Sequence, residues 1–279
     1  MLAPLGVGTG LYSRWASLNI GFMVTNVYPG RLGEFARPVA LSRMEPVTVS
    51  GALGTVVLER VLDTVALVLL LLVALLSPTF PSGATVYGRP IGFAVTGAII
   101  LAIAALAILG VVIAWPSALL GMVRKLDGFL PEGVIEGTAQ RLESFGQGLQ
   151  LLRQPAALAQ ALAWSVFLWV WMAASFWAGF RAFGIGLGAV PALFTQCAVS
   201  VFVAIPAGPG FIGTMQAGIA VSVQEIFGIT ADQTLSLAVG YHLAGYIPVT
   251  ALGLYYASRL GLQVKSVESE IETAMEGHH

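Results

Sequence analysis

Charged residues are scarce in this chain, and their scarcity excludes an ordinary water-soluble domain. Asp, Glu, Lys and Arg make up 10% of its 279 residues, whereas soluble domains carry roughly 25%. Hydrophobic residues make up 57%, so the polar surface is too small to cover a globule of this size. Lipid is therefore the expected solvent. The net charge of −1 also argues against a nucleic-acid partner, because such a partner requires excess Lys and Arg to neutralise its phosphates.

Cysteine is nearly absent, and no catalytic constellation is visible. Cys197 is the one cysteine, so the chain can form no internal disulfide and offers no thiol pair to a metal. We expect it to be a small buried residue. The sequence contains no recognisable nucleophile triad, metal-ligand cluster or pair of carboxylates suited to acid–base hydrolysis. We therefore expect no catalytic residue, no metal site and no cofactor, and the chain also lacks the basic start of a cleavable signal peptide.

Long apolar runs, by contrast, are abundant. Runs of this length can cross a hydrocarbon core that is about 30 Å thick. Strong spans are predicted at 51–76, 91–115, 156–180 and 234–258, and weaker or partial ones at 11–28, 189–205 and 211–227. The sequence thus predicts an all-α polytopic membrane protein with about seven spans, some of them broken or re-entrant.

The order of these runs predicts one transmembrane domain over residues 1–265. Its halves would be 1–115 and 156–265, joined by the segment 117–155, and 266–279 would form a polar, tag-like tail. The joining segment has apolar residues at helical spacing beside polar ones, which indicates an amphipathic helix. Two interpretations stay open for it, a solvated connector and a helix that contacts lipid head groups.

The distribution of basic residues predicts the orientation. Arg31, Arg37 and Arg43 precede the first strong span, and more basic residues follow the second, whereas the loop between these spans has only Arg89. The positive-inside rule makes the richer side cytoplasmic. We expect a multi-pass protein of the cell (inner) membrane with a cytoplasmic C-terminus.

A polar stripe runs along the first strong span. Gly51, Thr55, Glu59 and Asp63 are spaced by four, which places them on one helix face, and Arg60 could pair with Asp63. A charge near the bilayer centre costs about 2.5–3.5 kcal/mol on insertion scales, so such groups face protein or a wet cavity. The stripe is either a polar pathway or head-group site inside the bundle, or its charged part is structural, with Glu59, Arg60 and Asp63 forming a clamp that holds the helices together.

The segment before this span breaks a helix. Pro29-Gly30-Arg31-Leu32-Gly33-Glu34 combines two helix breakers with an arginine, and Arg37 follows. Arginine forms bidentate hydrogen bonds with phosphate, so the segment suits a phosphate or phospholipid head group. An ordinary positive-inside loop is the alternative.

A second break lies at residues 206–216. It contains a literal G-x-G-x-x-G at Gly208, Gly210 and Gly213, but a dinucleotide fold is excluded because no soluble βαβ unit surrounds it. Its Pro209-Gly210-x-Ile212-Gly213 repeats the pattern P-G-x-[L/I]-G of the first break. Interrupted helices at matching positions of two halves point to a transporter binding site, although simple loop chemistry would also explain five matching positions.

His242 lies in the last span beside Tyr241 and Tyr246. A lone histidine within a membrane span could relay protons. The alternative is a packing residue whose hydrogen bonds are satisfied, and the sequence leaves both open.

Three stretches resemble the lysylphosphatidylglycerol synthase transmembrane-region family, a flippase-like family of polytopic membrane proteins. They are RLGEFARP at 31–38, TVVLERVLD at 55–63 and PGFIGT at 209–214, and the resemblance runs from about residue 20 to residue 260. It implies two pseudo-symmetric, inverted halves. Better-known members flip aminoacylated phosphatidylglycerol between leaflets, and others are linked to lipid-carried sugars.

The resemblance implies a lipid path lined by charged residues and by the second break. The expected substrate-binding residues include glycines of the two break motifs. On one side they are Arg31, Gly33, Glu34, Arg37, Glu59, Arg60 and Asp63, and opposite them are Gly208, Gly210, Gly213 and Gln216. Gln216 stands where the family often has an acidic residue. The family usually has a further hydrophobic helix before the first motif, and this chain starts almost at the motif.

The expected function is translocation of a phosphate-bearing lipid, such as a phospholipid or a polyprenyl-phosphate-linked sugar. No soluble synthase domain follows the spans, so aminoacyl transfer, and enzyme activity in general, is not expected. The alternatives are a membrane scaffold or subunit for a lipid-modifying enzyme, and a membrane enzyme that acts on a lipid-linked substrate. The expected partner is a membrane lipid with an anionic head group, and a homo-oligomer and a lipid-synthesis enzyme stay open as protein partners.

Overall fold

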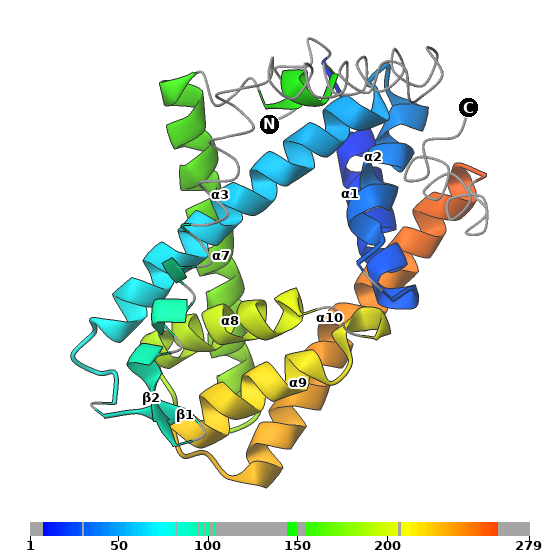
Figure 1. The fold of residues 1–279 in the computed structure, drawn as a ribbon. Coiled ribbons are helices and arrows are strands. Elements are labelled where there is room, and N and C mark those ends of the chain that lie inside the picture. Colours follow the sequence, from blue (N-terminus) through cyan, green and yellow to red (C-terminus); the bar gives the residue numbers. More distant parts are fainter. Residues whose placement is uncertain are drawn as a thin grey trace, which may run out of the picture. The chain divides into compact units, whose positions relative to one another are not determined.

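Helices make up most of the described chain. The computed structural model describes residues 8–29, 31–81, 83–86, 88–93, 95–97, 99–100, 103, 144–149, 154–205 and 208–261. Its main helices are α1 (Leu11–Val27), α2 (Gly33–Met44), α3 (Val49–Leu75), α7 (Pro155–Ala182), α8 (Ala189–Ala204), α9 (Thr214–Ile219) and α10 (Ala231–Arg259) (Figure 1). The predicted helical class is confirmed for these residues.

Three short elements accompany the main helices. The 3₁₀ helix η3 (Pro209–Phe211) precedes α9, and the π-helical η4 (Ala220–Ile226) follows it. Strands β1 (Thr85–Val86) and β2 (Arg89–Pro90) pair antiparallel within the predicted loop after α3, so this loop includes a small hairpin.

Proline sets the ends of two helices. The residue before a proline is pushed out of the helical region, because the proline ring clashes with its backbone. Tyr28, before Pro29, accordingly has φ −109° and ψ 147° and ends α1. Ile205, before the second break, has φ −69° and ψ 126° and ends α8. Both predicted breaks therefore start where the sequence placed them.

Two of the described helices are long and apolar enough to cross a membrane. These are α7, with 28 residues, and α10, with 29, while α8 is a shorter apolar helix. Only 11% of the most apolar window of α7 and 22% of that of α10 are buried within the protein. A core helix of a soluble protein would be largely buried, so this exposure suits contact with lipid.

The charges of α3 set it apart from these two helices. It has 27 residues and ends in an uncharged run, but every 18-residue stretch within it includes Glu59, Arg60 and Asp63. A stretch with three ionisable residues is not a simple apolar span. Of the predicted spans, 51–76 is therefore confirmed as a helix, and the total of about seven crossings stays a prediction.

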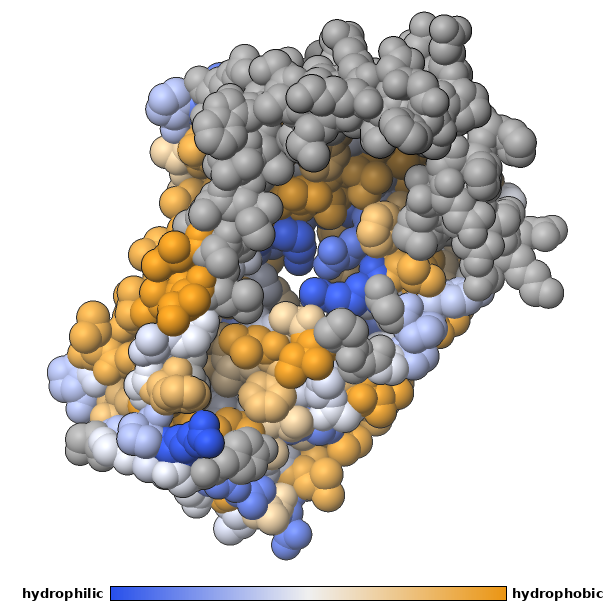
Figure 2. All heavy atoms as spheres, viewed as in Figure 1, coloured by the Kyte–Doolittle hydropathy of each residue, from blue (hydrophilic) through white to orange (hydrophobic). Residues whose placement is uncertain are grey.

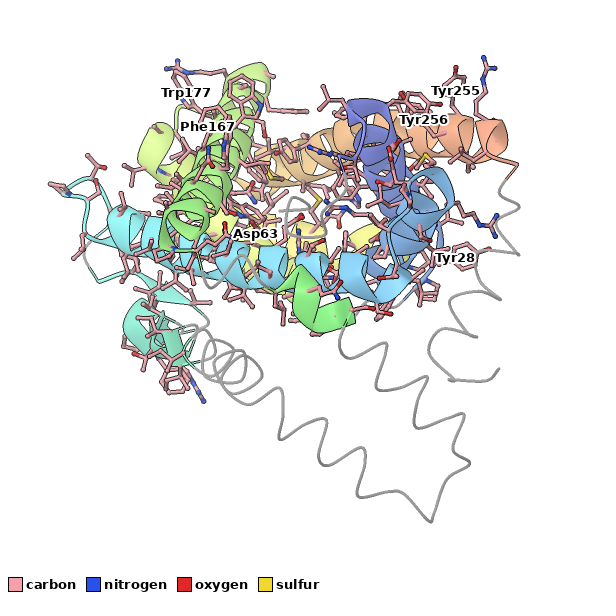
Figure 3. The ribbon with its side chains drawn as sticks, turned by 90° about the horizontal axis from the view of Figure 1, so that it is seen from above. Tyr28, Asp63, Phe167, Trp177, Tyr255 and Tyr256 are labelled. Carbon is pink, nitrogen blue, oxygen red and sulfur yellow. The ribbon has the colours of Figure 1, made fainter. Side chains whose placement is uncertain are left out.

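Large apolar side chains are exposed on the long helices. On α7 they include Trp164, Phe167, Trp171 and Trp177, and Figure 3 labels two of these beside the ribbon of that helix. Figure 2 shows apolar residues over much of the viewed surface. An aqueous surface of this composition would aggregate, whereas a lipid-facing surface requires it.

The chain divides into two compact units. Unit 1 consists of Met1–Val61, Leu106–Ala159 and Val249–His279, and unit 2 consists of Leu62–Ala105 and Gln160–Pro248. Helices α3, α7 and α10 each continue from one unit into the other. The predicted halves follow the order of elements along the chain instead, so this division does not test them.

In unit 1, α1 and α2 lie side by side (Figure 1). Their core contains Ile20, Met23 and Val24 of α1 and Ala36 and Ala40 of α2, all at most 3% exposed. The last part of α10 packs on the same core.

Glycine allows the α1–α2 contact. A Cβ atom on Gly33 would lie 1.9 Å from the carbonyl oxygen of Gly21 and 2.1 Å from Oγ1 of Thr25. No side chain fits at that distance, so the two helix backbones touch directly. A similar contact holds α10, where a Cβ on Gly253 would lie 2.2 Å from Cβ of Met23.

The loop after α2 is tied to the start of α1. Glu45 accepts a hydrogen bond from the amide of Gly10 at 2.9 Å. A hydrogen bond from Ser13, together with that amide, lowers the pKa of the Glu45 carboxyl group. The carboxylate therefore stays ionised to a lower pH than an ordinary glutamate and ties the end of α2 to the start of α1.

In unit 2, α8 and α9 pack against α7 and the first part of α10. The core includes Phe176 and Phe180 of α7, Val199 of α8, Ile219 of α9 and Leu237 of α10. Glycine again sets the closest approach, because a Cβ on Gly218 would lie 2.8 Å from Cα of Val199. Each break thus joins two helices whose backbones are in near contact.

Substitution of Gly33 tests the backbone contact in unit 1. We expect Gly33→Ala to destabilise the protein by about 1–3 kcal/mol, because overpacking forces the helices apart. Denaturant unfolding in detergent micelles, followed by circular dichroism, measures the effect.

Gly245→Ala is the matched control. Nothing lies within 4 Å of a Cβ at Gly245 in α10, and alanine in an exposed helix interior stabilises by about 0.5–1 kcal/mol relative to glycine. Equal stability of the Gly33→Ala variant and the wild type would contradict the close crossing.

Candidate functional site

The first break holds Arg31 in a strained conformation. Its φ is 59°, in the left-handed region that non-glycine residues occupy at a cost of about 1–2 kcal/mol. Nε of Arg31 lies 3.8 Å from Oε1 of Glu34, with both side chains about one-third exposed. This is a loose ion pair, and Arg31 also makes an interaction beyond it.

The carboxylate of Glu59 lies between two arginines. Its Oε1 accepts a hydrogen bond from Nη1 of Arg37 at 2.9 Å and one from Nη2 of Arg60 at 3.0 Å. We call these three residues the ionic cluster. Charge-assisted hydrogen bonds of this length are the strong ones, so the cluster links α2 to α3.

The ionic cluster is not sealed from its surroundings. The side chains of Arg37, Glu59 and Arg60 are 28%, 23% and 43% exposed. Both arginines approach the same carboxylate oxygen of Glu59, and Arg60 has a further interaction of its own. Arginines that remain partly accessible can exchange hydrogen bonds with an incoming anion such as a phosphate.

The helix crossing described above places Arg37. A Cβ on Gly21 would lie 3.0 Å from Cβ of Arg37, so Arg37 begins at the α1–α2 contact and extends to α3. Among the predicted site residues, Gly33 therefore acts by packing, and it sets the position from which Arg37 reaches Glu59.

The polar stripe of α3 has two parts. Gly51 and Thr55 are buried, and a Cβ on Gly148 would lie 2.3 Å from the carbonyl oxygen of Gly51. This part packs against the segment 144–149. Glu59 forms the ionic cluster, and Asp63 is half-buried and has an interaction of its own. The pairing of Asp63 with Arg60 stays a prediction.

The described part of the second break, from residue 208 on, contains three residues with positive φ. These are Gly210 at 63°, Phe211 at 59° and Gly213 at 93°. Glycine adopts such values freely, whereas Phe211 does so at a cost of about 1–2 kcal/mol. Gly210 is buried, and Gly208 and Gly213 are exposed. The segment is thus bent sharply before α9 begins.

A hydrogen-bond network fixes this second break. The amide of Gly213 donates to Oε1 of Gln216 at 2.8 Å, and Nε2 of Gln216 lies 2.8 Å from Nδ1 of His242. Nε2 of His242 lies 2.8 Å from the carbonyl oxygen of Gly210. Both ring nitrogens of His242 therefore have hydrogen-bond partners, as the interpretation of His242 as a packing residue expected. Gln216 is a neutral amide, so it adds no charge to the network.

The two breaks share their order of elements. Helix α1 (17 residues) leads through the first break to α2 (12 residues) and the long α3 (27 residues). Helix α8 (16 residues) leads through the second break to α9 and η4 (6 and 7 residues) and the long α10 (29 residues). Arg31 and Phe211 hold the same position in P-G-x-[L/I]-G, and both have φ 59°.

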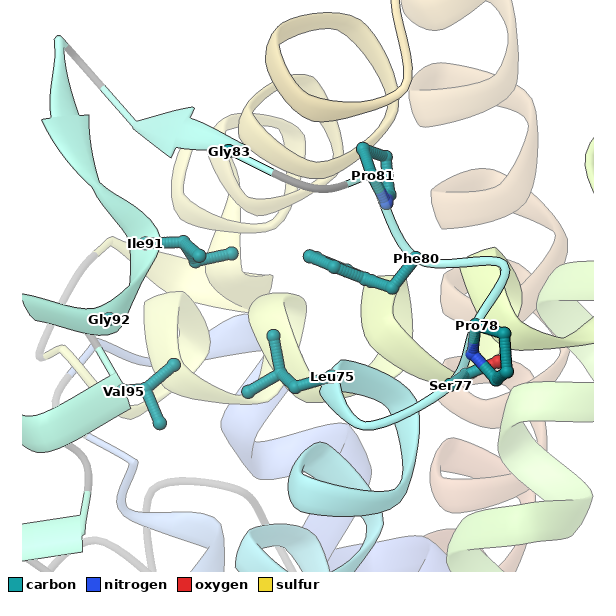
Figure 4. Close-up of a pocket in the computed structure, with 9 residues that line it drawn as sticks. All are labelled: Leu75, Ser77, Pro78, Phe80, Pro81, Gly83, Ile91, Gly92 and Val95. Carbon is teal, nitrogen blue, oxygen red and sulfur yellow. The ribbon is translucent and has the colours of Figure 1, made fainter.

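A cavity of about 510 Å³ lies in unit 2, beside the loop that follows α3 (Figure 4). Its described lining is apolar or uncharged and includes Leu75, Phe80, Ile91 and Val95. None of the predicted site residues lines it. Over the described part of the chain, no three His, Cys, Asp or Glu side chains are grouped as a metal site would require.

Residues 1–253 match the model of the family described as lysylphosphatidylglycerol synthase TM region. The chain belongs to this family. It is accordingly a membrane protein tied to lipid metabolism or translocation, and the exposed apolar helices agree with a membrane location. No curated protein and no solved structure matches this family member.

The structure brings together only some of the predicted site residues. Arg37, Glu59 and Arg60 meet in unit 1, and Gly210, Gly213 and Gln216 belong to one network in unit 2. The predicted placement of these groups opposite each other stays a prediction. The expected site did not include His242. The sequence signal that could have identified it is that it is the one histidine within a predicted apolar span.

A double-mutant cycle tests the ionic cluster. Arg37→Ala and Glu59→Ala should each destabilise the protein, and the double variant should lose less than the sum. We expect a coupling energy of about 0.5–3 kcal/mol, the range for residues in direct contact. Unfolding in detergent gives all four stabilities, and a coupling below about 0.3 kcal/mol would mean that solvent screens the pair.

Proposed function

We propose that this protein translocates a phosphate-bearing lipid between the two leaflets of the membrane. The observation that carries the proposal is the ionic cluster, in which Arg37 and Arg60 share the carboxylate of Glu59 and remain partly exposed. A purely architectural clamp would be expected to bury its charges fully. Here an anion can take the place of part of the Glu59 contact.

The cost of charges in an apolar chain supports this proposal. Each ionised side chain at the bilayer centre costs about 2.5–3.5 kcal/mol on insertion scales, so ionisable residues are rare in membrane helices and mostly have a function there. A lipid phosphate crossing the bilayer meets the same cost. Arginines lower that cost for the phosphate by replacing the hydrogen bonds of water with bidentate ones.

The two breaks also support it. Transporters often bind their substrates at helices that are interrupted at corresponding positions of two repeats. Here each break has the sequence P-G-x-[L/I]-G, one left-handed non-glycine residue and a short helix that follows. In the proposal, the two segments are the equivalent elements of an internal repeat, and Arg31 and Glu34 of the first one contact the head group.

A lipid-flip assay in proteoliposomes tests the proposed function. Phosphatidylglycerol with a fluorescent acyl chain is placed in both leaflets, and dithionite bleaches the probe that reaches the outer leaflet. The wild type should expose the inner-leaflet probe faster than protein-free vesicles do. Arg37→Ala should lower this rate by about tenfold or more, because a hydrogen bond to a charged group contributes about 1.5–3 kcal/mol.

Arg259→Ala is the matched control. The Arg259 guanidinium lies over the ring of Tyr255, 5.5 Å from its centroid, and takes no part in the ionic cluster. Its removal should leave the flip rate within about twofold of the wild type, because Arg259 is exposed and lies outside the ionic cluster. A wild type that flips no faster than empty vesicles would favour a scaffold for a lipid-modifying enzyme instead.

A further inference from the structure

The network at the second break has a fixed direction of hydrogen donation. The carbonyl oxygen of Gly210 can only accept, so Nε2 of His242, 2.8 Å away, must carry the hydrogen. The neutral ring then presents Nδ1 as an acceptor, and the amide nitrogen of Gln216 donates to it. Oε1 of Gln216 is left to accept from the Gly213 amide. Every group is satisfied with His242 neutral.

Protonation of His242 breaks this chain of donors and acceptors. A charged imidazole carries hydrogen on both nitrogens, so Nδ1–H would face the NH₂ group of Gln216. If the Gln216 amide turns over, its oxygen can accept from Nδ1–H, but its NH₂ group then faces the Gly213 amide. In either orientation two donors oppose each other, so the protonated ring and the closed network exclude one another.

The described segments that hydrogen-bond to His242 carry no charged side chain that would stabilise the added proton. Pro209–Phe211 and Thr214–Ile219, the two segments that contact His242, contain no ionisable residue. The aromatic neighbour on α10 is Tyr246, whose ring is edge-on at 5.8 Å from the imidazole. Tyr241, the residue before His242, is hydrogen-bonded to Ser175 at 2.6 Å.

We propose that His242 is a proton-sensitive latch for the second break. When the ring is neutral, it holds the segment 208–213 against α10 through Gly210 and Gln216. When the ring takes up a proton, Nε2–H still donates to the Gly210 carbonyl, but the Gly213 amide loses its partner or Gln216 leaves His242, so the Gly213 end of the segment is released. The left-handed Phe211 favours release, because its strain is relieved once the network opens.

The latch goes beyond the proposed function, since it concerns a movement of this segment that can be measured without lipid transport. Histidine is the side chain that ordinarily changes its charge between pH 5 and 8. The latch would therefore make the break responsive to the proton concentration on the side of the membrane that reaches it.

A nitroxide spin label on the break tests the latch. Ile212→Cys places the label on a residue that is 66% exposed, in a Cys197→Ser background that removes the native thiol. Electron paramagnetic resonance spectra are recorded in nanodiscs from about pH 8 to pH 5, the range in which histidine titrates. We expect the mobile fraction to rise by about two- to tenfold, the change that one lost hydrogen bond produces.

Two variants of the latch sharpen the test. His242→Gln keeps a donor for the Gly210 carbonyl but cannot take up a proton, so the pH response should disappear. Gln216→Glu replaces the amide by a carboxylate, which accepts from both the Gly213 amide and a protonated ring. In that variant the segment should be more mobile at high pH than at low pH, which reverses the response.

A label at Leu235→Cys is the control for the fold. Leu235 is 62% exposed on α10 in the same unit, and its spectrum should not change with pH. A pH-independent label at Ile212→Cys in the wild-type latch would overturn the proposal. A response that survives in His242→Gln would also overturn it, because the terminal His278 and His279 are still present there. If Gln216→Glu does not fold, the His242→Gln comparison decides alone.

Discussion

The sharing of one carboxylate by two arginines is the contact on which unit 1 depends. An unpaired charge in an apolar environment costs several kcal/mol, so pairing lowers the free energy of the fold. Arg37 and Arg60 accordingly both hydrogen-bond to Glu59. Their pairing holds α2 against the part of α3 that carries the charges. It also leaves the guanidinium groups partly accessible, so under the proposed function the same contact would both stabilise the fold and bind an anionic head group.

Direct backbone contacts make this pairing geometrically possible. Without a solvent-driven hydrophobic effect between helices in lipid, close packing at small residues provides much of the association energy. The contact of Gly33 with Gly21 brings α1 and α2 together, and that of Gly218 with Val199 does so for α9 and α8. Each break is therefore the turn of a tight helical hairpin, and the polar groups at its end are held at fixed positions.

The sequence predicted the helices better than the site. The apolar runs 156–180, 189–205 and 234–258 became α7, α8 and α10 with ends shifted by only a few residues, because length and flanking Gly or Pro determine them. The Arg37–Glu59 contact was not predicted, because its partners are 22 residues apart on different helices and depend on the glycine crossing. The His242–Gln216 contact, between residues 26 apart, escaped prediction for the same reason.

Arg31 and Phe211 stand at positions where glycine would be free of strain. Both have φ 59°, a value that glycine adopts without strain, and each directly follows a glycine in the sequence. A cationic and an aromatic side chain are nevertheless present at the matching positions of the two motifs. The two breaks therefore share a left-handed φ at this position but carry unlike chemistry there, an ionic group in unit 1 and an aromatic ring in unit 2.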